Sequence, residues 1–334
     1  MNEGSVMLKE FISIYSPTGS TEEAVNFLVD WANNNGFEAH KDSVGNFVAS
    51  IGSGEEILLV GHLDTVEGEI PIKLEGRKLF GRGSVDAKSS LVCFLEAAKK
   101  VTGKKVTVVG CMDEEKESHG AKFLLDKYNP SYIVIGEPSG WNGLTLGYRG
   151  RINIFYELFQ DKEHHSTDTP NALENGIAFF NNVKKLCNEY NKEKSMFYSI
   201  GSKLVSINSH DDGFKENIKL KINVRLPIGL DVDEFKSKIE HLNKNGIIDY
   251  STHELPVKTG KANKLVNAFI KQIDGIKFKV KSGTSDMNIL QKYNVPIVAY
   301  GPGDSSLDHT PNEFIDLDEF DKSVEILGNV LNSL

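Results

Sequence analysis

Residues 57–64 read ILLVGHLD, a run of four large apolar residues followed by a glycine, a histidine and, two residues later, an aspartate. A short, continuous apolar run is typical of a strand that is buried on both faces of a parallel sheet. Similar runs occur at 106–109 (VTVV), 132–135 (YIVI) and 296–300 (PIVAY), and a helical pattern spans about 87–100. Strands that alternate with helices favour an α/β fold, with a mostly parallel sheet sandwiched by helices.

Another helix is predicted near the N-terminus. Residues 20–23 (STEE) have the pattern of a capping box, and apolar residues follow at helical spacing up to Trp31. Gly36 has the position of a residue that ends a helix in the left-handed conformation.

The segment from about 150 to 255 has a different order of predicted strands and helices. It predicts a strand at 152–159, a helix at 171–190, strands at 203–208 and 218–226, a helix at 232–242 and a strand at 247–252. This β-α-β-β-α-β order is that of the ferredoxin-like split motif. We therefore predict a larger domain made of residues 1–149 and 256–334, into which an α+β domain of residues 150–255 is inserted.

Composition excludes several classes of protein. The chain has 334 residues, 39% of them hydrophobic, and a formal net charge of −9, which argues against a broad nucleic-acid interface. No apolar run approaches the roughly 20 residues of a membrane span, and no secretory signal is visible. The three cysteines form no CxxC pair. We expect a soluble, cytoplasmic protein with no nucleic-acid or membrane partner.

Residues that can bind a metal follow each of the four apolar runs. In parallel α/β sheets the carboxyl ends of the strands meet at one edge, where ligands bind. Asp86 joins them from the loop before the predicted helix at 87–100. We therefore expect one cluster made of Asp86 together with His62 and Asp64 after the first run, Glu114 and Glu115 after the second, Glu137 after the third and His309 after the fourth.

The types of residue in this set indicate catalysis by a metal. Two imidazoles and several carboxylates without a thiolate suit Zn²⁺ or Co²⁺ in an open site. Because residues i and i+2 of an extended segment share a side, Asp64 is expected to accept a hydrogen bond from His62. Adjacent Glu114 and Glu115 should point apart, so that one binds metal while the other handles a water proton. A single carboxylate, Asp86, could bridge two ions about 4 Å apart.

Each of these residues alone has a simpler interpretation. A lone histidine after a strand is usually structural, and a pair of glutamates is usually a solvated turn. The coincidence of several such sites at one sheet edge favours the metal centre. No G-x-x-x-x-G-K-[ST] or G-x-G-x-x-G motif follows a strand, so a nucleotide-binding fold has little support.

The motifs also resemble those of a known family, the co-catalytic di-zinc deacylases and exopeptidases. This family includes succinyl-diaminopimelate desuccinylase, acetylornithine deacetylase and glutamate carboxypeptidase. The resemblance implies a zinc exopeptidase-like catalytic domain (1–149 and 256–334), an inserted dimerisation and lid domain (150–255), two Zn²⁺ per subunit that Co²⁺ can replace, and a homodimer. It rests on GHLDT (61–65), GRGSVDAK (81–88), DEE (113–115), GEPS (136–139) and DHTPNE (308–313).

Roles follow from the resemblance, position by position. It makes His62 and Glu137 ligands of one zinc and His309 and Glu115 ligands of the other, and it makes Asp86 the bridge between them. Asp64 orients His62, and Glu114 is the general base.

The resemblance also assigns residues of the inserted domain. His165 looks like the histidine that crosses the dimer interface to stabilise the oxyanion, although the usual upstream glycine is absent and His164 lies beside it. Whether His164 shares this role stays open. The residues that resemble a clamp for the substrate carboxylate are Asn208, Arg225 and the turn Ser282-Gly283-Thr284.

A narrower resemblance is to the LysK group within this family. These hydrolases release lysine or ornithine from the amino-group carrier protein LysW. The similarity lies in GHLDTVEGEIPIKLEG (61–76), GRGSVDAKSSL (81–91) and GYRGR (147–151). It implies metal-assisted hydrolysis of the amide between the carrier's terminal glutamyl γ-carboxyl group and the amino acid.

Three alternatives remain open. The first is a small-molecule deacylase acting on N-acetylornithine or N-succinyl-diaminopimelate, and the second is a dipeptidase or carboxypeptidase. The third is a non-catalytic zinc-binding protein, against which the presence of both Asp64 and Glu114 argues. Because the whole chain is acidic, we expect an acidic carrier to need a local basic face, which we predict to contain Lys184, Lys185, Lys219 and Lys221.

Overall fold

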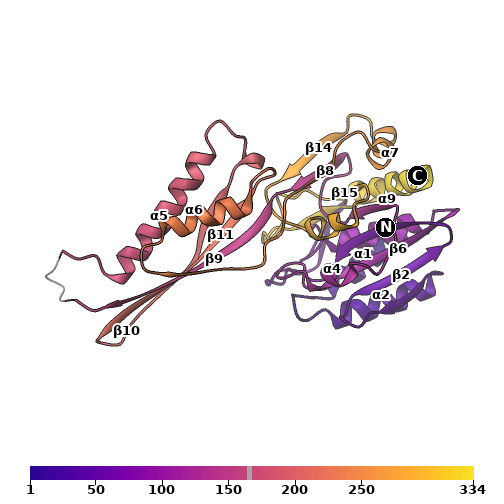
Figure 1. The fold of residues 1–334 in the computed structure, drawn as a ribbon. Coiled ribbons are helices and arrows are strands. Elements are labelled where there is room, and N and C mark those ends of the chain that lie inside the picture. The colour runs from indigo at the N-terminus through magenta and orange to yellow at the C-terminus, as the bar shows by residue number, and fades with distance from the viewer. Residues whose placement is uncertain (164–167) are drawn as a thin grey trace. The chain divides into compact units, whose positions relative to one another are not determined.

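The computed structural model describes residues 1–163 and 168–334 (Figure 1). The chain divides into two compact units, each with its own hydrophobic core. The larger unit comprises Met1–Gly147, Thr259–Val280 and Ser285–Leu334, and the inserted unit comprises Tyr148–Lys258 and Lys281–Thr284. The short segment Lys281–Thr284 therefore belongs to the inserted unit, which the sequence pattern does not indicate.

The main sheet of the larger unit contains the four predicted strands side by side. They form β3, β6, β7 and β15, which are neighbours in the order β6-β3-β7-β15 and run parallel to one another. The sheet continues on both sides of these four strands. On one side β2 pairs antiparallel with β6 and β1 pairs antiparallel with β2; on the other β8 pairs antiparallel with β15 and is also paired with β13 and β14. The strands are β1 (Glu38–Lys41), β2 (Phe47–Gly52), β3 (Glu55–His62), β6 (Lys104–Cys111), β7 (Tyr132–Ile135), β8 (Gly143–Tyr148), β13 (Val257–Lys258), β14 (Lys277–Lys281) and β15 (Ile297–Ala299).

Apolar side chains are buried on both faces of this sheet. Ile57 and Leu59 pack in one core with helices α1, α2, α3, α7 and α9. Leu58 and Val60 point to the opposite face and are also fully buried. The predicted α/β fold class is therefore confirmed. The helices are α1 (Glu3–Ser13), α2 (Glu22–Asn34), α3 (Lys88–Ala98), α4 (His119–Leu124), α7 (Lys264–Gln272), α8 (Met287–Leu290) and α9 (Leu317–Ser333), with a 3₁₀ turn at Gln291–Tyr293.

The predicted capping box of α2 is not formed. The helix begins at Glu22 with Thr21 as its N-cap, and the Thr21 side chain makes no capping hydrogen bond. An N-cap residue normally has an extended backbone, whereas Thr21 already has helical angles (φ −100°, ψ −1°). The amphipathic pattern therefore predicts this helix correctly, while the proposed cap is wrong.

A small sheet of three strands brings together two loops that are far apart in the sequence. It consists of β4 (Lys73–Glu75), β5 (Lys78–Phe80) and β16 (Phe314–Asp316), in the order β16-β5-β4. Phe314 is paired with Phe80 in the antiparallel ladder, and the centroids of their rings are 5.1 Å apart. The loop after Phe80 and the loop before Phe314 therefore leave this sheet at the same end.

The inserted unit has the predicted β-α-β-β-α-β order. Its sheet is antiparallel in the order β10-β11-β9-β12, so the first and third strands are central, as in the split motif. Helix α5 begins with a capping box formed by Asn171 and Glu174. The elements are β9 (Gly150–Asp161), α5 (Ala172–Tyr190), a 3₁₀ turn (Met196–Tyr198), β10 (Gly201–Asp211), β11 (Lys215–Leu226), α6 (Val232–Leu242) and β12 (Ile247–Tyr250).

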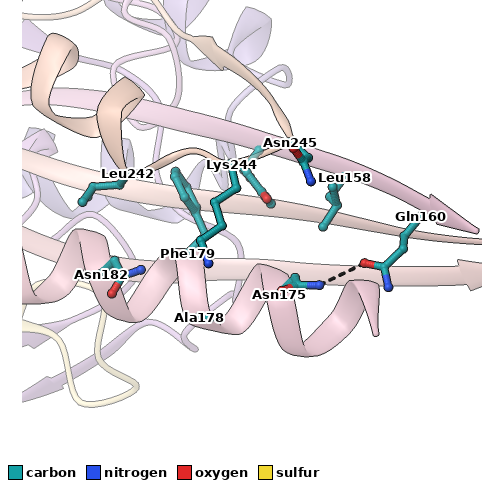
Figure 2. A pocket seen from close by; sticks show the side chains of 10 residues that line it. Leu158, Gln160, Asn175, Ala178, Phe179, Asn182, Leu242, Lys244 and Asn245 are labelled. Carbon is teal, nitrogen blue, oxygen red and sulfur yellow. Dashed lines mark hydrogen bonds between the residues drawn. The ribbon is translucent and has the colours of Figure 1, made fainter. Parts of the chain in front are cut away.

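A small crevice lies between α5, the sheet and the loop after α6 (Figure 2). Phe179 stacks on Tyr156 beside it, and the Asn175 amide donates a hydrogen bond of 2.9 Å to the Gln160 side chain. Its volume is about 100 Å³, which is room for only a few water molecules. We interpret it as a packing feature of this unit.

The four predicted docking lysines do not share one face. Lys219 and Lys221 alternate along β11 with Leu220 and Ile222, whose side chains pack in the core beneath α5. The side chains of these two lysines therefore lie on the other face of the sheet. Lys184 and Lys185 instead lie on the exposed side of α5, while its Val183 faces the core. The prediction of a single basic face is wrong because the sheet separates the two pairs.

Among the described residues, no helix is long and apolar enough to cross a membrane.

Candidate metal centre

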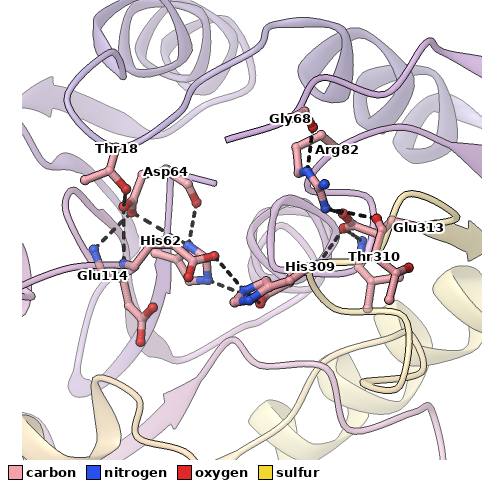
Figure 3. A network of polar contacts seen from close by, with 12 residues as sticks. Thr18, His62, Asp64, Gly68, Arg82, Glu114, His309, Thr310 and Glu313 are labelled. Atoms are coloured by element: carbon pink, nitrogen blue, oxygen red, sulfur yellow. Dashed lines mark hydrogen bonds and ion pairs between the residues drawn. The ribbon is translucent and has the colours of Figure 1, made fainter. Parts of the chain in front are cut away.

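The predicted cluster lies at the carboxyl ends of the parallel strands, and Figure 3 shows His62, Glu114 and His309 among its residues. His62 is the last residue of β3, and Glu137 follows the end of β7 by two residues. Glu114 and Glu115 come shortly after β6, and His309 lies in the long loop after β15. Because these four strands are neighbours in the sheet, their side chains meet at one edge.

The side chains form two groups of potential metal ligands that share Asp86. One group is His62, Asp86 and Glu137, and the other is Asp86, Glu115 and His309; within each group the ligand atoms lie within 4.8 Å of one another. Asp86 Oδ1 is 3.0 Å from His62 Nε2, and Asp86 Oδ2 is 3.1 Å from His309 Nε2. His309 Nε2 is also 3.1 Å from Glu115 Oε1. Asp86 therefore offers one oxygen to each group.

Negative charge is concentrated at this edge of the sheet. Burial, together with the carboxylates of Glu137, Asp286 and Glu115, raises the pKa of Glu114 well above its ordinary value, despite the opposing effect of His62. Hydrogen bonds to Asp86 and Glu115 raise the pKa of His309 to about 10. Such crowding of carboxylates is relieved by a cation. The set of imidazole and carboxylate ligands therefore fits a pair of divalent ions.

The orientation of His62 also fits a ligand. Its Nδ1 lies 2.8 Å from the backbone carbonyl oxygen of Asp64 and donates a hydrogen bond to it, so Nε2, which lies 3.0 Å from Asp86 Oδ1, is the nitrogen left to bind a metal. Burial would lower the pKa of His62, but the carboxylates of Asp86, Glu114 and Asp64 together raise it well above its ordinary value.

The Asp64 carboxylate does not form the predicted hydrogen bond to His62. The closest distance between its oxygens and His62 Nδ1 is 3.8 Å, because β3 ends at His62 and the extended geometry does not continue. Instead this buried carboxylate accepts hydrogen bonds from the Thr18 hydroxyl at 2.7 Å and from the backbone N–H groups of Glu114 at 3.0 Å and Glu115 at 3.3 Å (Figure 3). Asp64 thus fixes the segment that carries both glutamates.

Two residues of this edge have left-handed backbone conformations, which are uncommon outside glycine. Asp113, next to Glu114, has φ 65°, and His309 has φ 60°. Conformations of this kind concentrate at functional sites, where the surrounding structure holds them in place.

Three further residues at this edge are missed by the sequence patterns. Asp286 is buried, and burial together with the charge of Asp64 raises its pKa to about 7. In the sequence it is marked only by its place two residues after the turn 282–284. Arg82 and Glu313 form a buried ion pair of 2.7 Å beside Asp86. They belong to the GRGSVDAK and DHTPNE motifs, but their types and spacing do not indicate that they meet.

The chain matches a protein family over most of its length. The model of the family described as peptidase family M20/M25/M40 matches residues 58–333. The chain belongs to this family. The membership predicted from the motifs is therefore confirmed.

Relatives within the M20 family extend over nearly the whole chain. A protein of Deinococcus radiodurans named LysW-lysine hydrolase is 35% identical over 347 residues, which cover 98% of this chain and 96% of the relative. A protein of Saccharolobus islandicus named LysW-lysine/LysW-ornithine hydrolase is 33% identical over 322 residues, which cover 94% of this chain and 90% of the relative.

Solved structures of M20 proteins share the fold. An M20 family metallo-carboxypeptidase from Sulfolobus solfataricus has a TM-score of 0.80 at 18% identity, covering 99% of both chains. The YXEP protein of Bacillus subtilis, described as a dinuclear metal binding peptidase from the M20 family, has a TM-score of 0.70 at 11% identity, covering 98% of this chain and 96% of that one. These likenesses agree with the α/β architecture described above.

The predicted carboxylate clamp is partly assembled within the inserted unit. Arg225 Nη1 donates a hydrogen bond of 3.1 Å to Thr284 Oγ1, and Arg149 Nε donates one of 3.0 Å to the Ser282 carbonyl oxygen. Burial and then the nearby guanidinium groups of Arg151 and Arg149 lower the pKa of Arg225. Positive charge is therefore gathered around the turn 282–284 of this M20 protein.

Two predicted residues of the inserted unit do not join this clamp. Asn208 is paired with Lys219 on β11, six residues from Arg225, which is about 20 Å along a strand. Within one chain the structure does not bring Asn208 and Arg225 together. His165 and its neighbour His164 lie outside the described residues.

Proposed function

We propose that this M20 protein is a metal-dependent amide hydrolase that releases lysine or ornithine from the carrier protein LysW. The proposal is carried by the similarity, over nearly the whole chain, to relatives named for hydrolysis of LysW-lysine and LysW-ornithine. The shared Asp86 and the two groups of ligands around it support a hydrolytic site. A role in amino-acid biosynthesis agrees with the cytoplasmic location that we expect from the sequence.

We propose Zn²⁺ as the metal, with Co²⁺ able to replace it. His62 and Glu137 would hold one ion and Glu115 and His309 the other, with Asp86 contributing to both. Neutral imidazole and carboxylate ligands in this number suit zinc in a catalytic site. When bound, two such ions polarise a substrate carbonyl and lower the pKa of a water molecule.

Glu114 is our candidate for the general base. Among the described residues, Glu114 belongs to neither group of potential metal ligands, so its carboxylate is available to accept a proton. The hydrogen bond from its N–H to Asp64 fixes its backbone. In the proposed reaction Glu114 takes a proton from water and returns it to the leaving amine, which is general acid–base catalysis by one carboxylate.

Arg225 and the turn 282–284 would bind a carboxylate of the substrate. The guanidinium is planar and can hold two carboxylate oxygens at once, which a lysine cannot do. His165 stays our prediction for the group that stabilises the oxyanion from a second subunit.

The substitution Arg225→Lys should lower kcat/KM for the LysW conjugate roughly 10- to 100-fold, because a charge-assisted pair of hydrogen bonds is lost. We expect most of this fall in kcat/KM to come from a higher KM. Steady-state kinetics check this, with Lys221→Arg on the same strand as the control. A variant with unchanged KM would contradict the role of Arg225 in binding.

We further propose that the inserted unit is a lid and forms a homodimer through β10. This strand is at the edge of its sheet, and its Val205 and Ile207 side chains are 53% and 42% exposed. A long edge strand with exposed apolar residues is prone to pair with another strand. Asn208 lies on the same strand, so dimerisation would present it to the partner subunit.

The substitution Ile207→Lys should therefore convert the dimer into a monomer, because it places a charge at the centre of the proposed interface. Light scattering coupled to size-exclusion chromatography measures the mass. Val44→Lys, at an exposed valine of the larger unit, is the control. A wild-type protein with the mass of one chain would contradict the proposed dimer.

Substrate comparison separates this function from the deacylase and dipeptidase alternatives. We expect zinc-loaded protein to hydrolyse LysW-γ-glutamyl-lysine and its ornithine analogue. We expect it to leave N-acetylornithine, N-succinyl-diaminopimelate and unmodified dipeptides intact. Turnover of one of the small substrates alone would move the protein to that class of M20 hydrolases.

A further inference from the structure

The two loops that carry Asp86 and His309 are attached to the same pair of strands, β5 and β16. The loop of residues 81–87 follows β5, and residues 309–313 precede β16, which is paired with β5. The Gly81 N–H donates a hydrogen bond of 3.3 Å to the Glu313 carbonyl oxygen. The backbones of the two loops are thus joined where they leave the small sheet.

The Glu313 side chain joins these loops a second time. It is 1% exposed. Its Oε1 accepts hydrogen bonds from the N–H groups of Val85 at 2.8 Å and of Asp86 at 3.1 Å. Its Oε2 accepts a hydrogen bond of 2.7 Å from Arg82 Nη1 (Figure 3). A residue four positions after His309 therefore holds the backbone of Asp86 directly.

Arg82 extends this connection to a third segment. Its Nη1 also lies 3.3 Å from the Thr310 carbonyl oxygen, next to His309. Its Nε donates a hydrogen bond of 2.9 Å to the Gly68 carbonyl oxygen (Figure 3). With a side chain that is only 8% exposed, Arg82 ties the segment after His62, the Asp86 loop and the His309 loop together.

The predicted ligands differ in how their backbones are supported. His62 is the last residue of β3 and is paired in the ladder with β6. Glu137 lies two residues after β7, and the Gly136 N–H between them donates a hydrogen bond of 2.7 Å to the Val60 carbonyl oxygen. Asp86 and His309 have no such ladder, because both lie in loops. Their mutual position therefore depends on contacts such as those of Glu313.

We propose that Glu313 and Arg82 are positioning residues that hold Asp86 against His309 and so preform the ion site of Asp86, Glu115 and His309. Neither residue belongs to the two groups of potential metal ligands found among the described residues. The inference rests on the proposed function, in particular on its two metal ions. Residues that orient metal ligands typically change metal affinity 10- to 100-fold when they are replaced.

The test titrates Zn²⁺ alone into metal-free protein and follows binding by calorimetry. Glu313→Gln is nearly isosteric and keeps an oxygen for the two N–H groups, but it loses the charge that pairs with Arg82. Arg82→Met removes the other partner. We expect each to weaken the ion of Asp86, Glu115 and His309 roughly 10- to 100-fold. The ion of His62, Asp86 and Glu137 should be weakened less, because His62 and Glu137 keep their support from the main sheet. Arg82→Lys, which restores the positive charge, should recover part of the loss.

A matched control and a second measurement distinguish positioning from general stability. Arg77 lies in the turn between β4 and β5 of the same small sheet and pairs with Asp318 at 2.8 Å and with Asp321 at 2.9 Å. Arg77→Met should keep both zinc affinities. Thermal unfolding of the metal-free variants measures stability separately. If the pair were purely structural, its loss would lower the unfolding temperature and leave the zinc affinities unchanged.

The outcomes separate this inference from the function on which it rests. A wild-type protein that binds fewer than two ions would overturn the proposed two-metal site. A wild-type protein that binds two ions, together with Glu313→Gln and Arg82→Met variants that bind both with wild-type affinity, would overturn only the positioning role.

Discussion

Replacing Glu114 by glutamine is expected to lower kcat roughly 10²- to 10⁴-fold, the usual contribution of a general base, while the protein keeps its metal. Glutamine has the shape of glutamate but cannot accept and return the proton. Among the described residues, Glu114 is in neither group of potential metal ligands, so its replacement should leave metal binding unchanged. Steady-state kinetics on the LysW conjugate and elemental analysis of the metal content measure the two effects.

Glu117→Gln provides the control, since Glu117 is an exposed residue of the same loop. Its kcat and metal content should equal those of the wild type. Loss of metal from Glu114→Gln would show that Glu114 is a ligand and would contradict its assignment as the base.

Replacing Asp86 by alanine is expected to weaken both metal ions. One Asp86 oxygen lies 3.0 Å from His62 Nε2 and the other lies 3.1 Å from His309 Nε2, so its removal takes a ligand from both groups. We expect each affinity to fall by about 100-fold or more, beyond the effect of changing a supporting residue. Activity should fall with the metal content.

Glu137→Ala is the matched comparison, because Glu137 belongs to one group only. It should weaken one ion and spare the other. Metal content after dialysis against a zinc buffer gives both stoichiometries. An Asp86→Ala protein that keeps one zinc with full affinity would contradict the bridging role.

The fold and the gathering of the site were predictable because they depend on short apolar runs. The runs at 57–60, 106–109, 132–135 and 296–300 became adjacent parallel strands. A parallel sheet brings together whatever follows its strands, which is why His62, Glu115, Glu137 and His309 meet although they are distant in sequence.

The details that failed depend on local backbone geometry, which apolar patterns do not determine. The hydrogen bond predicted from the Asp64 side chain assumed an extended chain beyond His62, where β3 ends. The capping box of α2 assumed an extended backbone before the helix, where Thr21 is already helical. Both errors concern the one or two residues at the end of an element.

Other features depend on contacts between segments far apart in the chain. Glu313 and Arg82 are 231 residues apart, and only the pairing of β16 with β5 brings them together. The predicted basic face failed for a related reason, because Lys184 on α5 and Lys219 on β11 lie on opposite sides of the inserted sheet. Spacing along the chain carries no signal for such contacts.

The most direct test of the proposed function is the mass of the carrier itself. LysW-γ-glutamyl-lysine and its ornithine analogue are incubated with zinc-loaded protein, with N-acetylornithine in a parallel reaction, and each product is measured by mass spectrometry. We predict that the conjugates lose the mass of the amino acid and that this loss is absent with Glu114→Gln. Conjugates of unchanged mass, together with hydrolysis of N-acetylornithine, would contradict the carrier-linked function.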